Sequence, residues 1–442
     1  MYTPRPTVRF GVFRAAALVF EAKLRKGHTM KLRNGQNMKL GSRRLLLAAA
    51  GMMVVWLIGV ALAAGAGQAG RGQAAPAAGQ AAPPAARGPA YPPGTELSEQ
   101  AFKNVTALTG IPVDEFMDTM GLFSAALSMC CAECHTGAGT DTVKWELDTP
   151  RKVTARRMVK MVAAINKDNF NGRQVVTCWS CHRGRDWPVT TPTIDTIYGT
   201  PTLEPDDILA RAPTGPTPVQ IIDKYIAAIG GADRVARLTS YTARGNSVGF
   251  GGFSGARPVE IYAKFPNQRA TFIHTDDGDI SRTFDGTAGW IATPLTTVKE
   301  FPLISGELDG ARFDAQIAFP QQLKTILTNP RASFSTTIND KEVDVVQGNG
   351  TRGLLVTLFF DKQSGLLVRM VRHANSAIGR VPYQLDFEDY REVAGTGVKI
   401  PYKWIYAWVD GRDTFELASV QPNAAIDAAK FGKPAPPTPR AR

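Results

Sequence analysis

Hydrophobic positions divide the chain into segments with different periods. Residues 45–64 (LLLAAAGMMVVWLIGVALAA) form one unbroken apolar run of twenty residues. Within residues 113–128 and 151–166, apolar side chains recur three or four positions apart, the spacing of an amphipathic helix. Between residues 240 and 420 the pattern changes to short runs of strand-forming residues bounded by turns. This order predicts an apolar leader, a helical unit and then a β-rich unit.

The apolar run predicts export from the cytoplasm. Arg43 and Arg44 precede it, and the small-residue sequence AGAGQAG follows it, which is typical of a secretory signal. About 20 apolar residues also suffice to cross a bilayer. We therefore assign residues 1–69 to a basic extension with a signal that is either cleaved near Ala64–Ala69 or kept as a membrane anchor. The rest of the protein is then periplasmic, either soluble or anchored on the outer face of the inner membrane.

Composition predicts where the compact units begin and end. The chain has 442 residues, a length that suits two or three domains. Residues 65–94 are Ala, Gly, Pro or Gln at 27 of 30 positions, which predicts a linker. The other predicted parts are a helical unit at 98–192, a second linker at 193–215, a β-rich unit at 216–432 and a tail at 433–442.

The net charge of +12 comes from the N-terminal end of the chain. Residues 1–44 hold eleven Lys or Arg and a single acid, Glu21, whereas the other 398 residues hold 40 basic and 38 acidic side chains. A nucleic-acid surface would need an excess of positive charge in the folded part. The nearly neutral remainder argues against a nucleic-acid partner.

All five cysteines lie between residues 130 and 181. Four of them form the sequences CAECH at 131–135 and CWSCH at 178–182. The CxxCH pattern is the attachment signature of c-type haem, because two thiols three positions apart can bond both vinyl groups and the next residue, His, can bind the iron. We predict two covalently bound c-type haems. Their thioether bonds would come from Cys131, Cys134, Cys178 and Cys181, and their iron ligands from His135 and His182.

Other roles for the cysteines account for less of the pattern. A zinc site made from both CxxC pairs would leave the His after each pair unexplained. Disulfides across each pair would be redox motifs of the thioredoxin type, which call for one CxxC at the start of a helix in a βαβ unit. Cys130 is left over by every one of these interpretations.

Methionines are the candidates for the sixth ligand of each iron. Each CxxCH is preceded by a predicted amphipathic helix that carries an M-x-x-M pair. The histidines His274 and His373 lie far away in the β-rich unit. We therefore predict that Met120 and Met158 bind the irons. A dihaem peroxidase-like enzyme would need an open sixth position, and these methionines argue against it. The predicted helical faces are Phe116, Met120, Phe123 and Leu127, and Met158, Met161, Val162 and Ile165.

The order of these motifs resembles that of a known family. Phe116-x-x-x-Met120 precedes CAECH, and Ala155-Arg-Arg-Met158 precedes VTCWSCHRG. Over Ser98–Pro192 the arrangement is similar to one half of the cytochrome c subunit of purple-bacterial photosynthetic reaction centres. That family has four haems where this chain has motifs for two. The resemblance implies an electron carrier, not an enzyme, in photosynthetic or related electron transport, with Met120 and Met158 as axial ligands.

Charge is unevenly divided within the helical unit. Ser98–Pro150 has two basic and eight acidic residues, whereas Arg151–Arg185 has nine basic residues and one acid. The basic side chains either neutralise haem propionates on a solvated face or dock an acidic redox protein near the second haem.

The β-rich unit is predicted to be an antiparallel, strongly curved sheet. A helix is predicted at 217–229 and a broken helix at Leu308–Leu327. The strands are predicted at 240–250, 256–264, 268–275, 280–293, 332–338, 341–347, 353–361, 366–374, 383–391, 398–409 and 413–420. The fold class is therefore multidomain, a mainly α dihaem cytochrome c unit followed by a mainly antiparallel β half-barrel with helices.

Short phrases in the β-rich unit resemble the half-barrel of periplasmic lipoprotein-carrier and lipoprotein-sorting proteins. They are VEIYAKFPNQ, FDGTAGW and DYREVAGTGVKIPYKW. The resemblance implies a lipid or acyl ligand in the concave face, unless Leu308–Leu327 fills it. The unit has no cysteine and no catalytic constellation. The alternative function is a lipid- or lipoprotein-binding half-barrel protein with accessory haems.

Overall fold

The computed structural model describes residues 91–192, 208–249 and 255–438, which belong to one compact unit, Pro84–Arg442. The leader predicted at 1–69 and most of the linkers predicted at 65–94 and 193–215 lie outside these residues, so they remain predictions. In the described part of the chain, no helix has both the length and the apolar character needed to cross a bilayer.

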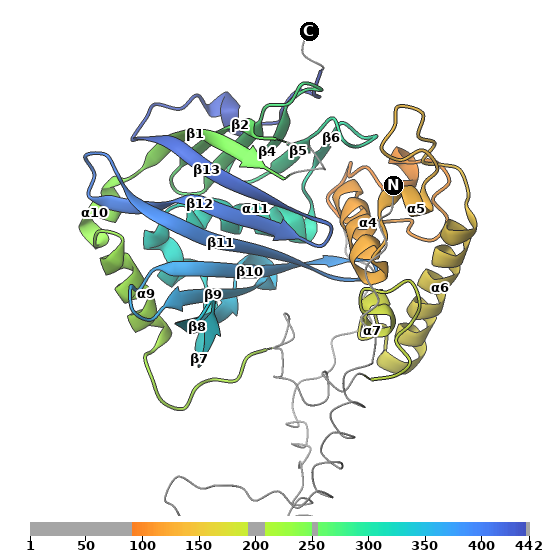
Figure 1. Cartoon of the computed structure of the whole chain (residues 1–442), viewed down its shortest axis with the longest axis horizontal. Coiled ribbons are helices and arrows are strands. Elements are labelled where there is room, and N and C mark those ends of the chain that lie inside the picture. The colour runs from red at the N-terminus through yellow and green to blue at the C-terminus, as the bar shows by residue number, and fades with distance from the viewer. Residues whose placement is uncertain (1–90, 193–207, 250–254, 439–442) are drawn as a thin grey trace, which may run out of the picture. The chain divides into compact units, whose positions relative to one another are not determined.

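Helices and loops form the chain between residues 98 and 182 (Figure 1). The two long helices, α4 (Val113–Leu127) and α6 (Pro150–Phe170), coincide with the predicted amphipathic segments. At the start of α6, the side-chain oxygen of Thr149 accepts a hydrogen bond from the Lys152 amide, and Pro150 occupies the first turn. The short helices are α3 (Ser98–Ala101), α5 (Cys131–Cys134) and α7 (Cys178–His182). Each CxxC motif thus forms a short helix.

The β-rich part is one antiparallel sheet of thirteen strands. Strands β6 and β7 form its edges, and the pairing of β1 with β13 joins the meanders β1–β6 and β7–β13. The strands are β1 (Ser240–Val248), β2 (Arg257–Lys264), β3 (Gln268–Ile273), β4 (Ile280–Phe284), β5 (Gly289–Ala292), β6 (Glu300–Pro302), β7 (Thr328–Ile338), β8 (Lys341–Asn349), β9 (Leu355–Asp361), β10 (Leu367–Ser376), β11 (Gly379–Val393), β12 (Val398–Trp408) and β13 (Gly411–Pro422). The predicted antiparallel open sheet is confirmed.

The sheet differs from the sequence prediction at two places. The predicted strand at 280–293 is interrupted, because the Asp285 carboxylate accepts hydrogen bonds from the amides of Thr287 and Ala288 and turns the chain between β4 and β5. Strand β6 was not predicted, because three residues are too few to display an alternating pattern.

Several helices pack on the sheet (Figure 1). They are α9 (Pro218–Ala228), α10 (Ala232–Arg237), α11 (Ser305–Ile317) and α12 (Leu323–Ile326), with the 3₁₀ turns η2 (Pro320–Gln322), η3 (Thr351–Gly353) and η4 (Ala428–Phe431). The predicted broken helix at 308–327 is confirmed, and its break coincides with Pro320, which lacks a backbone donor. Phe313 of α11 and Phe319 beside η2 are fully buried against the sheet residues Leu358 and Phe360.

Helix α4 packs directly on the sheet. Its residues Leu122 and Ala126 share a buried cluster with Val381 and Tyr383 of β11. The turn between β10 and β11 contacts the same helix, since a Cβ on Gly379 would lie 2.8 Å from Cδ2 of Leu122. The side of α4 that carries Leu122 and Ala126 is therefore buried against the sheet. The rest of the helix surface is available for other contacts.

Candidate functional site

The first CxxCH motif lies at the junction of α5 and α6. The Thr149 hydroxyl, which caps α6, donates a hydrogen bond to the carbonyl oxygen of Cys134 at 2.9 Å. His135 follows α5, and its ring contacts the Trp145 ring at a centroid distance of 5.0 Å. Burial, followed by the charge of Lys152, lowers the pKa of His135. The imidazole is thereby kept neutral, which is the form that binds metal.

In the second motif, a hydrogen bond sets the orientation of the histidine ring. Thr177 caps α7 by accepting a hydrogen bond from the Ser180 amide. Nδ1 of His182 lies 2.9 Å from the carbonyl oxygen of Arg185. Since a carbonyl can only accept, Nδ1 carries the proton and Nε2 keeps its lone pair. Metal-binding histidines in proteins are typically oriented in this way, so the residues present fit a haem iron ligand.

Asn166 holds the loop that leads into the second motif. This side chain is buried on α6, its Nδ2 donates to the Val176 carbonyl at 2.7 Å, and its Oδ1 accepts from the amides of Val175 and Val176 at 3.1 and 2.9 Å. The sequence motifs predicted no role for Asn166. The available signal was a single amide in the apolar half of an amphipathic pattern, which predicts a buried polar group with backbone partners.

The four motif cysteines differ in exposure, and no disulfide joins them in the described part of the chain. Cys178 is buried, and burial raises the pKa of its thiol to about 11, whereas Cys181 and Cys131 are exposed. Burial also raises the pKa of Cys134. In the described ranges, no three His, Cys, Asp or Glu side chains cluster closely enough to hold a metal ion, so the two CxxC pairs are not brought together there.

The predicted methionine ligands lie on half-buried surface. The buried residues of α4 include Leu122 and Ala126, which face the sheet, while Met120 on the predicted face is only partly covered. On α6, Met158 is partly covered and Met161 is 44% exposed. The exposed large apolar residues of this part of the chain are Leu147, Val153, Met161, Val175, Trp179 and Trp187. Uncovered apolar surface around both motifs suits the faces of two porphyrins. Iron ligation by Met120, Met158, His135 and His182 stays a prediction.

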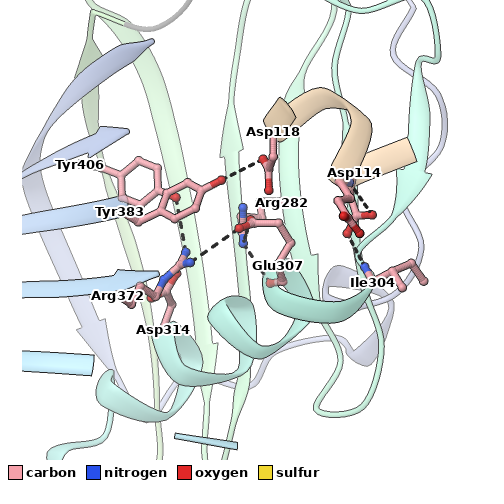
Figure 2. Close-up of polar contacts among 10 residues, drawn as sticks. Asp114, Asp118, Arg282, Ile304, Glu307, Asp314, Arg372, Tyr383 and Tyr406 are labelled. Carbon is pink, nitrogen blue, oxygen red and sulfur yellow. Dashed lines mark hydrogen bonds and ion pairs between the residues drawn. The ribbon is translucent and has the colours of Figure 1, made fainter. Parts of the chain in front are cut away.

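A buried polar network joins α4 to the sheet (Figure 2). The Tyr383 hydroxyl donates a hydrogen bond to Oδ1 of Asp118 at 2.9 Å. Burial, then the charges of Glu307 and Asp114, raises the pKa of Asp118 well above its usual value. A neutral Asp118 removes one negative charge from the interface between α4 and β11.

The network continues below Tyr383 through a fully buried arginine. The Arg372 guanidinium lies 4.4 Å from the centroid of the Tyr383 ring and contacts both carboxylate oxygens of Asp314, at 3.2 and 3.0 Å. Glu307 is shared, since its Oε1 lies 3.7 Å from Arg372 and its Oε2 accepts from Arg282 at 2.9 Å. Two cations thus balance two carboxylates, and Arg372 and Glu307 are the most deeply buried of the four groups.

The concave side of the sheet encloses an apolar cavity. Its volume is about 260 Å³. Ile317 and Ala318, at the end of α11, line the cavity together with Leu385, Tyr390 and Trp404 of the sheet. Helix α11 and the residues that follow it therefore cover part of the concave face of the sheet but leave the cavity open. Arg282, Asp314 and Tyr406 of the polar network also line the cavity.

Two comparisons with known proteins found similarities, one in each half of the chain. Residues 63–199 match the family described as photosynthetic reaction centre cytochrome C subunit, which confirms the resemblance predicted from the motifs. A putative outer membrane lipoprotein-sorting protein domain from Vibrio parahaemolyticus is 11% identical, covers 48% of this chain and 97% of its own, and has a TM-score of 0.34. A LolA superfamily protein from Nitrosomonas europaea is 13% identical, covers 50% of this chain and 99% of its own, and has a TM-score of 0.33. Among curated proteins, no match to this chain was found.

The burial of Asp114 predicts a pH-dependent stability. Asp114 is 3% exposed, its Oδ2 accepts from the Ile304 amide at 2.5 Å, and burial raises its pKa to about 8. Because the pKa of Asp114 is higher in the folded state than in the unfolded state, the contribution of Asp114 to stability is greatest at low pH. This contribution is lost as the pH rises toward 8. We expect the free energy of unfolding, measured by chemical denaturation, to fall between about pH 5 and pH 8.

Asp114→Asn should flatten this decline, because Asn keeps an acceptor for the Ile304 amide and cannot ionise. The matched control is Asp148→Asn, since Asp148 is an exposed carboxylate paired with Arg156, and Arg156 lowers its pKa. A decline of equal size in Asp114→Asn and the wild type would contradict the assignment.

Proposed function

We propose that this protein is an exported dihaem c-type cytochrome that transfers single electrons. The observation that carries the proposal is the order along the chain, in which a methionine-bearing helix precedes each CxxCH helix, together with the hydrogen bond that leaves Nε2 of His182 free. The family match over residues 63–199 supports it. Bound haem iron supplies one-electron chemistry by alternating between its ferric and ferrous forms.

The chain's own residues would hold and orient the cofactors. Cys131 and Cys134 would anchor one haem, and Cys178 and Cys181 the other. His135 and His182 would donate their ring nitrogens to the irons, and the hydrogen bond to Arg185 would keep His182 in the required tautomer. Met120 and Met158 would donate their thioether sulfurs from α4 and α6. Two filled axial positions suit electron transfer better than peroxidase-like catalysis.

An acidic redox protein is the partner that we propose near the second haem. Trp179 and Trp187 are 47% and 77% exposed there, and Arg183 and Arg185 are exposed beside them. An apolar centre with a basic rim favours brief encounters with an acidic surface. Arg156 has another task, since it pairs with Asp148 and donates to the Asn104 carbonyl.

A second candidate function is the binding of an acyl chain in the half-barrel. It is favoured by the cavity of about 260 Å³ on the concave side of the sheet, which α11 leaves open. The apolar walls would accept hydrocarbon, and Arg282 at one end would receive a polar head. This function is compatible with electron transfer in the same chain.

The first prediction concerns haem content. Protein produced with haem-maturation machinery should contain two covalent haems by intact mass and by pyridine haemochrome. Cys134→Ala and Cys181→Ala should each lower the haem content by about half, because each motif attaches its haem independently. Cys130→Ala is the matched control and should keep both. Protein with one haem or none would refute the proposal.

The second prediction concerns the axial methionines. The oxidised protein should show the weak sulfur-to-iron charge-transfer band in the far red, and Met120→Ala with Met158→Ala should abolish it. Met120→His and Met158→His should each lower one reduction potential, because Met raises the potential of a haem relative to a second His. Met161→Ala on α6 is the control. An unchanged spectrum in the double variant would exclude this ligand pair.

The third prediction concerns the cavity. Full-length protein should bind a fluorescent fatty acid, and Leu385→Trp should weaken binding by about tenfold or more, because the larger ring occupies part of the cavity. Phe334→Trp, on the exposed surface of β7, is the control and should bind as the wild type does. Equal affinity in both variants would show that the fatty acid binds elsewhere.

A further inference from the structure

The turn between β12 and β13 contacts the helix that carries Met120. A Cβ on Gly121 of α4 would lie 2.9 Å from Cγ2 of Val409 and 3.3 Å from Oδ1 of Asp410. A larger residue at this position would have to displace the side chains of Val409 and Asp410, so glycine suits the close approach of the turn. The half-barrel thus brings a carboxyl group against α4, one residue from the predicted iron ligand.

Asp410 is held in place on two sides. Trp408, which also lines the apolar cavity, forms a hydrogen bond from its side chain to the Asp410 carboxylate. Trp408 and Val409 pack against the buried cluster that contains Leu122 of α4. Partial burial raises the pKa of Asp410, while the residue as a whole remains exposed to solvent.

The same carboxylate acts on the first haem-attachment motif. The pKa of the Cys131 thiol is raised by burial and then by the charge of Asp410. Asp410 is therefore near enough to both α4 and α5 for its charge to act on the Cys131 thiol, where the haem would be attached. No other side chain of the β12–β13 turn carries a charge, since the turn reads Trp408, Val409, Asp410 and Gly411.

The turn that contacts the second motif carries no charge, in contrast to the turn with Asp410. The turn between β10 and β11 contacts this motif, because a Cβ on Gly379 would lie 3.4 Å from Cβ of Thr177, and the Gln174 side chain donates to the Ser376 carbonyl at 3.1 Å. This turn, residues 376–379, reads Ser-Ala-Ile-Gly and carries no charge. Adjacent hairpins of one sheet therefore present a carboxylate to the first motif and a neutral turn to the second.

We propose that Asp410 is a residue of the first haem site, contributed by the half-barrel, and that its negative charge lowers the reduction potential of that haem alone. The inference rests on the proposed function. Reduction adds an electron to the site, and the negative charge of a nearby carboxylate disfavours that added charge. The half-barrel is in this way part of the redox centre, because it sets a difference in potential between the two haems.

Spectroelectrochemical titration of the full-length protein with its haems tests the proposal. The haem whose potential falls in Met120→His is identified as the first. Asp410→Asn should shift the equilibrium of that haem toward the reduced form by about tenfold, or ~59 mV for one electron, and leave the second haem unchanged. Asp410→Glu, which keeps the charge, should stay within about threefold of the wild type. Asp340→Asn, in the exposed turn between β7 and β8, is the matched control and should change neither potential.

A shift smaller than about twofold, or equal shifts of both haems, would overturn the proposal. Haem-free protein supplies a second measurement that does not depend on haem loading. Because Asp410 raises the pKa of Cys131, Asp410→Asn should accelerate alkylation of Cys131 by iodoacetamide at pH ~8 and leave buried Cys178 unchanged. If neither thiol responds, the proximity is wrong. If the protein binds no haem but Cys131 responds, the proposed function fails while the placement of Asp410 stands.

Discussion

The hydrogen bond between Tyr383 and Asp118 is the contact on which the arrangement of this protein depends. It connects α4, which carries Met120, to the ion pairs that the buried Arg372 of β10 forms with Glu307 and Asp314 of α11. Removing a charged member of this network, such as Glu307, would leave the buried Arg372 without one of its partners, at a cost of about 3–5 kcal/mol. The neutral form of Asp118 is the form that this burial favours. Helix α4 is therefore positioned by polar chemistry as well as by the packing of Leu122 and Ala126.

The same contact explains how α4 can pack against the sheet and also carry Met120, the predicted iron ligand. The side of α4 with Leu122 and Ala126 is buried against β11, whereas Met120 lies on half-buried surface. One hairpin turn of the sheet contacts α4 at Gly121, and the neighbouring turn contacts the start of the second CxxCH motif at Thr177. The sheet is thus more than a separate binding module, because its turns contact both α4 and the second motif.

The apolar cavity of the half-barrel borders the buried polar network. The cavity of about 260 Å³ reaches Arg282 and Tyr406, which also belong to the network below Tyr383. Trp408 lines the cavity and bonds to Asp410. A molecule in the cavity and a cofactor at the first motif would therefore act on two neighbouring side chains, Trp408 at the end of β12 and Asp410 in the turn that follows.

The sequence alone determined the parts that depend on local spacing. The CxxCH motifs, the helices at 113–128 and 151–166, the broken helix after residue 308 and the antiparallel strands all follow from residues close together in the chain. Only the tertiary structure decided the rest. Asp118 and Tyr383 are 265 positions apart, and Gly121 and Asp410 are further apart still, so no local pattern could pair them. Their meeting depends on which face of α4 is buried, and the periodicity predicted the apolar face with Met120, whereas packing buried the face with Leu122.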